Sequence, residues 1–203
     1  MEGTGISQDL ELLPALASVL SVRTGTACSV DSPGLALALA AGPSQAGAWV
    51  GIVGLPDLGW EAAFDLGLDL GRTIAVPDPG DHWLSVIAGL IDVTTVVVVR
   101  PPGRVSEAQA ARVAARLRQR GSVMVAVGGW PRSALSLMTV SNRWSGLGRG
   151  FGHLSNRGVT VAIRTGAAAI REVQLGLSAE ERTLVCVDPN AVSGADAADV
   201  LAG

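Results

Sequence analysis

Short apolar runs alternate with amphipathic stretches over the first 130 residues, and the two patterns predict different elements. Runs rich in valine and alanine predict buried strands, most clearly the β-branched run TTVVVVR. These runs cover residues 26–30, 48–54, 73–76, 94–100 and 122–129. Stretches with leucine and alanine at helical spacing predict helices over residues 35–42, 60–68, 81–91 and 105–121. Strands that alternate with helices predict an α/β fold, with a doubly wound, mostly parallel sheet flanked by helices.

The pattern loosens after residue 130. Residues 133–140 predict a short helix, and residues 141–158 predict a long loop with four closely spaced glycines. Later strands are expected at 159–165 and 183–188. The acidic end of the chain, residues 189–203, is expected to be a flexible tail.

Four leucines repeat at helical spacing near the N-terminus and predict an amphipathic helix over residues 7–22: Leu10, Leu13, Leu16 and Leu20. Two interpretations of this stripe stay open. It is a core helix of the same domain, or it docks on a second copy or a partner, as amphipathic helices do in grooves. The predicted organisation is an N-terminal element at 1–24, a core at 25–188 and the tail at 189–203.

The composition excludes several kinds of chemistry. All fifteen basic residues are arginine, so lysine Schiff bases, a lysine general base and a phosphate-loop lysine are impossible. Apolar runs fall short of the ~20 residues of a membrane span, and no signal-peptide pattern opens the chain, so we expect a cytoplasmic protein without membrane contact. Cys28 and Cys186 sit in apolar runs and are expected to be buried free thiols, with a disulfide as the alternative.

The charge distribution is strongly uneven. Residues 1–99 carry two arginines and eleven carboxylates, a net −9. Residues 100–171 carry twelve arginines and one carboxylate, a net +11, and residues 172–203 return to −5 with one arginine and six carboxylates. A basic middle section of this kind predicts a polyanionic partner.

The predicted loop at 141–158 contains the residue types that bind single-stranded DNA. Arginines can contact phosphates, aromatic rings can stack on bases, and glycines let the backbone follow the strand. The candidate DNA-binding residues are Arg143, Trp144, Arg149, Phe151, His153 and Arg157, with Arg164 on the following strand as an extension. The alternative is a solvated loop whose aromatic side chains, Trp144 above all, pack on the core.

Three arginines share one face of the predicted helix at 105–121, at i, i+4 spacing: Arg112, Arg116 and Arg120. Such a row is commonly a solvated surface. Because no acidic residue is near them in the sequence, we also expect them to add to the positive field of the middle section.

The turn after the first predicted strand resembles a phosphate-binding loop that has lost its chemistry. Its four residues, 31–34, are about four fewer than the motif needs, and they lack the lysine and its neighbouring hydroxyl. Arg100 follows the strand at 94–99, where a Mg²⁺-side carboxylate is needed, and an arginine would repel the metal. Asp57 is displaced from the place of a water-activating carboxylate. We therefore expect no ATPase activity, no catalytic residues, no cofactor and no metal site.

The order of these elements resembles the RecA-type recombinase core, with LGLDLGRTIAVPDP at 66–79 as the matching phrase. Over residues 7–188 the chain looks like the RecA-like accessory proteins of actinobacterial mutasomes, called ImuA-prime, of the ImuA/SulA-like branch. The phrase NRWSGLGRGFGHLSNRGVTVAIRTGAA at 142–168 carries this closer resemblance.

The resemblance implies a non-catalytic adaptor in damage-induced (SOS) translesion DNA synthesis, associated with the nucleoid after damage. Its implied partners are a catalytically silent Y-family polymerase homologue (ImuB-like), an error-prone C-family polymerase contacted indirectly, single-stranded DNA, and a second copy or RecA. A SulA-like cell-division inhibitor that binds a tubulin-like protein is the alternative, and it has no need of the +11 section. A nucleotide-dependent recombination regulator is a third possibility, which calorimetry with ATP and Mg²⁺ would test.

Overall fold

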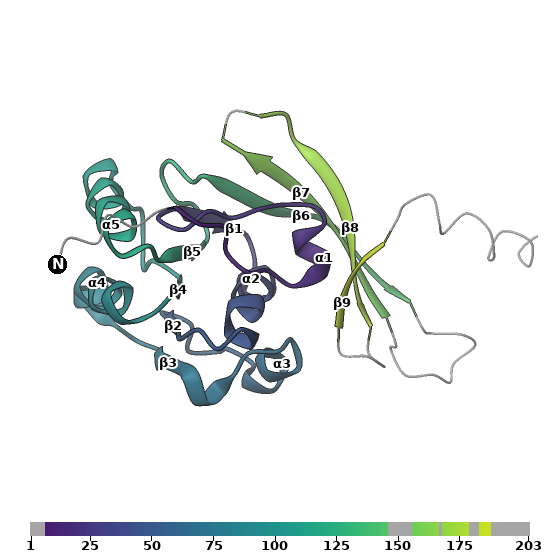
Figure 1. The fold of residues 1–203 in the computed structure, drawn as a ribbon, viewed down its shortest axis with the longest axis horizontal. Helices are drawn as coiled ribbons and strands as arrows, with labels where there is room; N and C mark the ends of the chain where they lie inside the picture. Colours follow the sequence, from purple (N-terminus) through teal and green to yellow (C-terminus); the bar gives the residue numbers. More distant parts are fainter. Residues whose placement is uncertain (1–6, 146–155, 167, 179–182, 188–203) are drawn as a thin grey trace, which may run out of the picture.

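The structure, a computed structural model, describes residues 7–145, 156–166, 168–178 and 183–187. Within these residues the strands form one sheet in the order β3-β2-β4-β5-β1-β6-β7-β8-β9 (Figure 1). The strands are β1 (Ala27–Val30), β2 (Val50–Val53), β3 (Thr73–Val76), β4 (Val96–Val99), β5 (Val123–Val127), β6 (Leu135–Ser145), β7 (Asn156–Thr165), β8 (Arg171–Ser178) and β9 (Thr183–Val187). In this order, the neighbouring strands β3, β2, β4, β5, β1 and β6 pair in parallel. The neighbouring strands β6, β7, β8 and β9 pair antiparallel.

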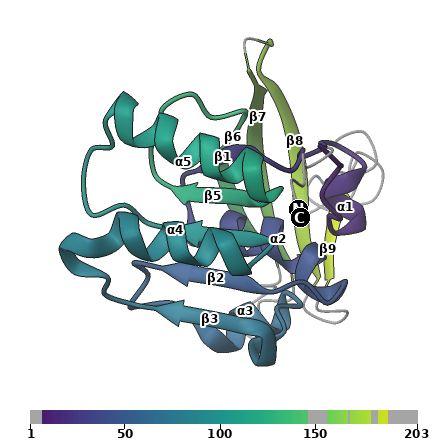
Figure 2. The same cartoon turned by 60° about the vertical axis from the view of Figure 1, so that its left-hand side comes forward.

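The helices cover both faces of the parallel half of the sheet (Figure 2). They are α1 (Pro14–Ala17), α2 (Pro33–Gln45), α3 (Trp60–Asp65), α4 (Trp83–Val93) and α5 (Glu107–Arg120), with short 3-10 turns at Leu70–Arg72 and Gly80–His82. Helices α1, α2 and α3 pack on one face, and α4 and α5 on the other. The predicted α/β fold with a mostly parallel sheet flanked by helices is therefore confirmed, while the antiparallel extension of the sheet was not predicted.

The central strands are apolar throughout because both of their faces are covered. In β4, Val96 and Val98 belong to the core cluster under α2, and Val97 and Val99 to the cluster under α4 and α5. Successive side chains of a strand point to opposite faces, so each valine is buried on one side or the other. This explains the uninterrupted β-branched run that predicted the strand.

Local signals set the ends of the two longest helices. Ser32 caps α2, with its hydroxyl accepting a hydrogen bond from the Leu35 amide at 3.4 Å, and proline occupies the first helical turn. In α5, Ser106 and Gln109 form a reciprocal capping box. The same helix ends at Gly121, whose φ of 68° lies in the left-handed region that glycine adopts without strain.

The predicted helix over residues 7–22 is wrong. Only α1, Pro14–Ala17, is helical: before it Asp9 forms an isolated bridge with Arg23, and a turn follows it at residues 18–19. The four leucines of the predicted stripe are all buried in this chain: Leu10, Leu13, Leu16 and Leu20. Their burial favours the core interpretation, since side chains inside the domain offer no stripe for a second copy.

The region after residue 130 is more regular than the pattern predicted. The expected helix at 133–140 is wrong, because the residues from Leu135 onward belong to β6, and the expected loop at 141–158 begins in β6 and ends in β7. The pairing of β6 with β7 shifts register between Thr139 and Ser141, as at a β-bulge. Residues 146–155 and the predicted tail lie outside the described residues.

Cys28 is fully buried in β1 and is a free thiol, as predicted. Desolvation by burial raises the pKa of this thiol to about 12, so it is protonated and unreactive at neutral pH. The side chain of Cys186 lies outside the described part of the chain. Among the described residues, none of the helices combines the length and apolar character that crossing a bilayer requires.

Candidate functional site

The strands β6 and β7 form a hairpin whose arms carry part of the predicted DNA-binding set. Arg143 and Trp144 end β6, and Arg157 lies near the start of β7. In the backbone register Trp144 is paired with Arg157, and Arg143 with Gly158. The hairpin therefore brings three of the predicted residues to one end of a two-stranded ribbon. Their side chains, and the whole of Arg149, Phe151 and His153, lie outside the described part of the structure.

Arg164 is far from this group. It is exposed near the other end of β7, opposite Ser136 in the register. Seven residues along the strand separate it from Arg157, roughly 23 Å at the rise of an extended chain. Arg164 can therefore extend a phosphate-binding path only along the full length of the hairpin.

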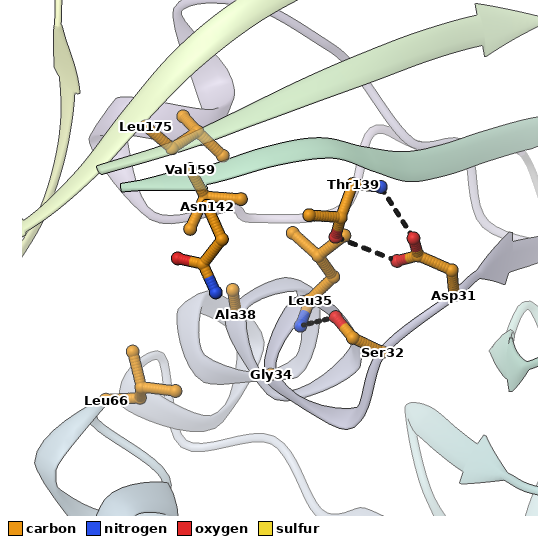
Figure 3. Close-up of a pocket in the computed structure, with 10 residues that line it drawn as sticks. All are labelled: Asp31, Ser32, Gly34, Leu35, Ala38, Leu66, Thr139, Asn142, Val159 and Leu175. Carbon is orange, nitrogen blue, oxygen red and sulfur yellow. Dashed lines mark hydrogen bonds between the residues drawn. The ribbon is translucent and has the colours of Figure 1, made fainter. Parts of the chain in front are cut away.

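A cavity of about 370 Å³ lies beneath the hairpin, at the N-terminal end of α2 (Figure 3). Its walls are mostly apolar, and three of its polar residues, Asp31, Ser32 and Thr139, lie together near the end of β1, whereas Asn142 lies apart from them. The lining residues from α2 and α3's end are Gly34, Leu35, Ala38 and Leu66, those from the turn after β1 are Asp31 and Ser32, and those from the hairpin and β8 are Thr139, Asn142, Val159 and Leu175.

Asp31 joins the end of β1 to the hairpin. Its carboxylate accepts hydrogen bonds from the Thr139 amide at 2.6 Å and from the Thr139 hydroxyl at 3.1 Å (Figure 3). Both contacts cross from the turn after β1 to the point where the register of β6 shifts. The position that would face a phosphate in a nucleotide-binding loop thus holds an anion that fastens two strands together.

The start of α2 offers little to an anionic ligand. Helix N-termini bind anions through free backbone N–H groups. Here Pro33 has no N–H, the Leu35 N–H is directed to the Ser32 hydroxyl, and the Asp31 carboxylate adds a negative charge beside them. The cavity suits an apolar group with a polar edge better than a phosphate.

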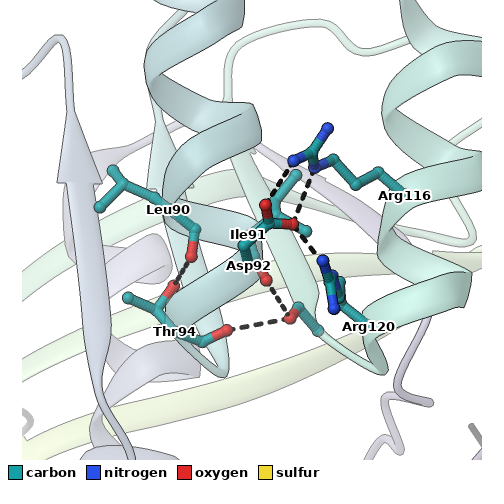
Figure 4. A network of polar contacts seen from close by, with 7 residues as sticks. Leu90, Ile91, Asp92, Thr94, Arg116 and Arg120 are labelled. Carbon is teal, nitrogen blue, oxygen red and sulfur yellow. Dashed lines mark hydrogen bonds and ion pairs between the residues drawn. The ribbon is translucent and has the colours of Figure 1, made fainter. Parts of the chain in front are cut away.

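Two of the three α5 arginines have an acidic partner that the sequence did not reveal. Asp92, in the last turn of α4, accepts hydrogen bonds from Arg116 (Nε to Oδ1, 2.8 Å) and from Arg120 (Nε to Oδ1, 3.0 Å) (Figure 4). The hydrogen bond from Arg116 lowers the pKa of Asp92 below its ordinary value, desolvation opposes this, and Arg120 adds to the lowering. The expectation that this row lacks an acidic partner is wrong for Arg116 and Arg120.

Another arginine of the basic section is also compensated, through an ion pair between Arg132 Nε and Glu107 Oε2 at 2.8 Å. Five others are exposed and make no side-chain hydrogen bond or ion pair with the described residues: Arg100, Arg104, Arg112, Arg118 and Arg164. Arg100 and Arg104 follow β4, at the carboxyl edge of the parallel strands, where α/β proteins commonly bind ligands. Arg100 and Arg104 were not among the predicted site residues, although their position directly after a buried strand could have identified them as candidate ligand-binding residues.

The strand order and the cavity at the end of β1 define an α/β protein whose sheet is wound on both faces and whose first turn is built around a carboxylate. Residues 12–132 match the family described as the MT3502 N-terminal domain; this is more than half of the chain, which therefore belongs to that family. The match runs from the segment before α1 to the loop after β5 and stops short of the hairpin.

One relative extends over a similar length. The chain is 39% identical over 129 residues to the protein described as "Uncharacterized protein Rv3395c" from Mycobacterium tuberculosis (strain ATCC 25618 / H37Rv). The alignment covers 62% of this chain and 62% of the relative, so the chain spans less than two thirds of that relative's length.

Proposed function

We propose that the protein is a non-catalytic adaptor of damage-induced translesion DNA synthesis, in which a RecA-like scaffold without ATPase chemistry holds single-stranded DNA and a Y-family polymerase homologue. The observation that carries the DNA part is the β6–β7 hairpin, whose register places Arg143, Trp144 and Arg157 at one end. Cations beside an aromatic residue on a ribbon are the parts that single-strand binding uses. The glycine-rich segment that joins the arms adds Arg149, Phe151 and His153.

The turn after β1 is the degenerate phosphate-binding loop of this proposal, and its chemistry supports a scaffold that does not hydrolyse ATP. Asp31 is engaged with Thr139, Ser32 caps its own helix, and Arg100 is exposed at the end of β4. A triphosphate with Mg²⁺ needs the reverse arrangement, with cations and free N–H groups near the phosphates and a carboxylate near the metal. The resemblance of the chain to mutasome accessory proteins supplies the polymerase partner.

A charge-reversal experiment tests the DNA part. The triple variant Arg143→Glu, Arg149→Glu, Arg157→Glu is titrated against fluorescein-labelled dT20 at several NaCl concentrations, with anisotropy as the readout. Each phosphate contact adds ~0.7 to the slope of log affinity against log salt for single strands, so losing three lowers the slope by about 2. The matched control reverses three described, exposed arginines elsewhere: Arg104, Arg112 and Arg118.

The proposal requires the hairpin variant to lose affinity and slope while the control keeps most of both. Equal losses in the two variants would show only a general effect of net charge, and an unchanged hairpin variant would remove the hairpin from DNA binding. For the partner part, affinity purification from damage-treated cells is expected to recover the Y-family homologue. Recovery of a tubulin-like protein without the Y-family homologue would favour the cell-division alternative instead.

A further inference from the structure

Helices α4 and α5 lie on the face of the sheet opposite α2 (Figure 2). A groove of about 450 Å³ runs between these two helices. Its floor is apolar: Ile91 and Val113 are buried, and Leu84 and Ala88 are half-buried. Ala115, exposed on α5, leaves the groove open because its side chain is a single methyl group. The groove therefore presents aliphatic surface that could accept the aliphatic side chains of another molecule.

The rim of this groove is cationic. Arg112 and Arg116 line it together with the amides of Gln109 and Gln119, and no carboxylate is among its described lining residues. Asp92, the acidic partner of Arg116, is engaged by both Arg116 and Arg120 (Figure 4). Arg112 makes no hydrogen bond or ion pair with any part of the chain that the structure describes, so its guanidinium has five free donors beside an apolar floor.

We propose that the α4–α5 groove docks an acidic amphipathic segment of a partner protein, with aliphatic side chains on the floor and a carboxylate on Arg112. Charge complementarity and the apolar floor favour this occupant. A nucleic acid brings phosphates for the arginine but no aliphatic side chains for Leu84, Ala88 and Val113. This proposal deepens the adaptor role. It rests on that role in one respect: the occupant of the groove is taken to be another protein.

Helix α5 supplies its own controls because it has two exposed sides. Arg112 and Ala115 line the groove, whereas Ala111 and Arg118 line a separate hollow beside Trp130. Arg118 is exposed like Arg112, and Ala111 is exposed like Ala115. Each groove substitution therefore has a partner with the same chemistry, on the same helix, outside the groove.

The experiment is a selection of random twelve-residue peptides displayed on phage against the folded full chain, followed by fluorescence anisotropy with the enriched peptides. We expect enrichment of sequences with two or more carboxylates among aliphatic residues. Arg112→Glu removes the charge-assisted hydrogen bonds and is expected to weaken these peptides at least about tenfold. Ala115→Trp fills the groove and is expected to do the same. Arg118→Glu and Ala111→Trp are expected to change affinity less than twofold.

Circular dichroism melts of the four variants establish that each is folded, and the conservative variant Arg112→Gln is expected to fall between wild type and Arg112→Glu. Enriched peptides without acidic residues, an empty selection, or equal losses in the groove and control variants would overturn the proposal. So would loss of dT20 binding in Arg112→Glu, which would make the surface a nucleic-acid site. The hairpin triple variant is expected to bind the peptides normally, so failure of the DNA proposal and failure of this one give different results.

Discussion

The contacts of single residues explain why this chain departs from a phosphate-binding loop. Asp31 lies 108 residues from Thr139 in the sequence, and its carboxylate accepts hydrogen bonds from both the amide and the hydroxyl of that residue. Both hydrogen bonds are exposed, and a typical intramolecular hydrogen bond contributes about 0.5–1.5 kcal/mol to stability, so the carboxylate has a modest structural role where it stands. A lysine or a free backbone N–H at this point would leave the start of the hairpin without its anchor.

Gly42 is a second residue with a role that only the fold reveals. It lies inside α2, and a Cβ built on it would come within 2.5 Å of the Leu12 carbonyl carbon and 2.6 Å of the Leu13 amide nitrogen. Both are backbone atoms, so the N-terminal segment would have to shift. We expect Gly42→Ala to lower the free energy of unfolding by about 1–3 kcal/mol, measured by urea denaturation.

Gly89→Ala is the matched control, because Gly89 is also inside a helix, is exposed, and has no other atom within 4 Å of a built Cβ. Alanine is the better helix former, so this variant is expected to gain about 0.5–1 kcal/mol. If Gly42→Ala were as stable as Gly89→Ala, the N-terminal segment would not be held against α2 in solution.

At the scale of elements, the sequence predicts the parallel strands β2 to β5 well, both where a strand is buried along its whole length, as β2, β4 and β5 are, and where it is half-buried at the sheet edge, as β3 is. β3, Thr73–Val76, has the predicted bounds, and β2, β4 and β5 lie within their predicted runs. β6 was missed although its period of two was visible, since buried Leu135 and Leu137 alternate with Ser136 and Met138. β7 contains the strand predicted at 159–165, and β9 lies within the one predicted at 183–188, whereas β8, which opens with the charged residues Arg171 and Glu172, was not predicted.

The contact between α4 and α5 shows what a helix-face pattern leaves out. Arginines at i, i+4 spacing identified one face of α5, but Asp92 comes from a different helix and was not predicted. Asp92 has one quarter of its side chain exposed, and its pKa is lowered mainly by the Arg116 hydrogen bond. A group whose folded-state pKa lies below its unfolded-state value stabilises the fold above that unfolded-state value. This stabilisation is lost as the pH falls through the lowered folded-state pKa.

We therefore expect Asp92→Asn to lower the urea midpoint at pH 7, and we expect the difference from wild type to narrow at pH 3, below the ordinary aspartate pKa of 3.8. The comparison variant is Asp57→Asn, whose exposed carboxylate makes no hydrogen bond or ion pair with the described residues. It is expected to match wild type at pH 7. If the difference in urea midpoint between wild type and Asp92→Asn stayed constant or grew at low pH, the Asp92 carboxylate would not bridge the two helices.

At the scale of the whole molecule, the uneven charge of the sequence is partly resolved by folding. Arg116 and Arg120 of the +11 section pair with Asp92 of the preceding acidic section, and Arg132 pairs with Glu107, the single carboxylate of the +11 section itself. The arginines without an acidic partner among the described residues lie on separate surfaces, which the sequence could not distinguish. These surfaces are the carboxyl edge of the parallel strands with Arg100, the α4–α5 groove with Arg112, and the hairpin. Counting charge along the chain predicts a polyanionic partner but not which surface meets it.

The two proposed binding surfaces are built from different elements, which leads to a prediction about their coupling. The cavity lies with α2 on one side of the sheet, the hairpin strands β6 and β7 belong to the sheet itself, and the groove lies on the other side, between α4 and α5. No described residue lines both. Perturbations at well-separated sites without shared partners usually add, and salt screens charges beyond about 8 Å at physiological ionic strength.

We therefore expect saturating dT20 to change the affinity of a groove-binding acidic peptide by less than twofold at 150 mM NaCl, measured by anisotropy of the labelled peptide. Arg112→Glu should abolish the peptide signal with and without DNA, and the hairpin triple variant should preserve it in both. A change above fivefold on adding DNA, in either direction, would mean that the β1–α2 turn or the sheet itself transmits binding.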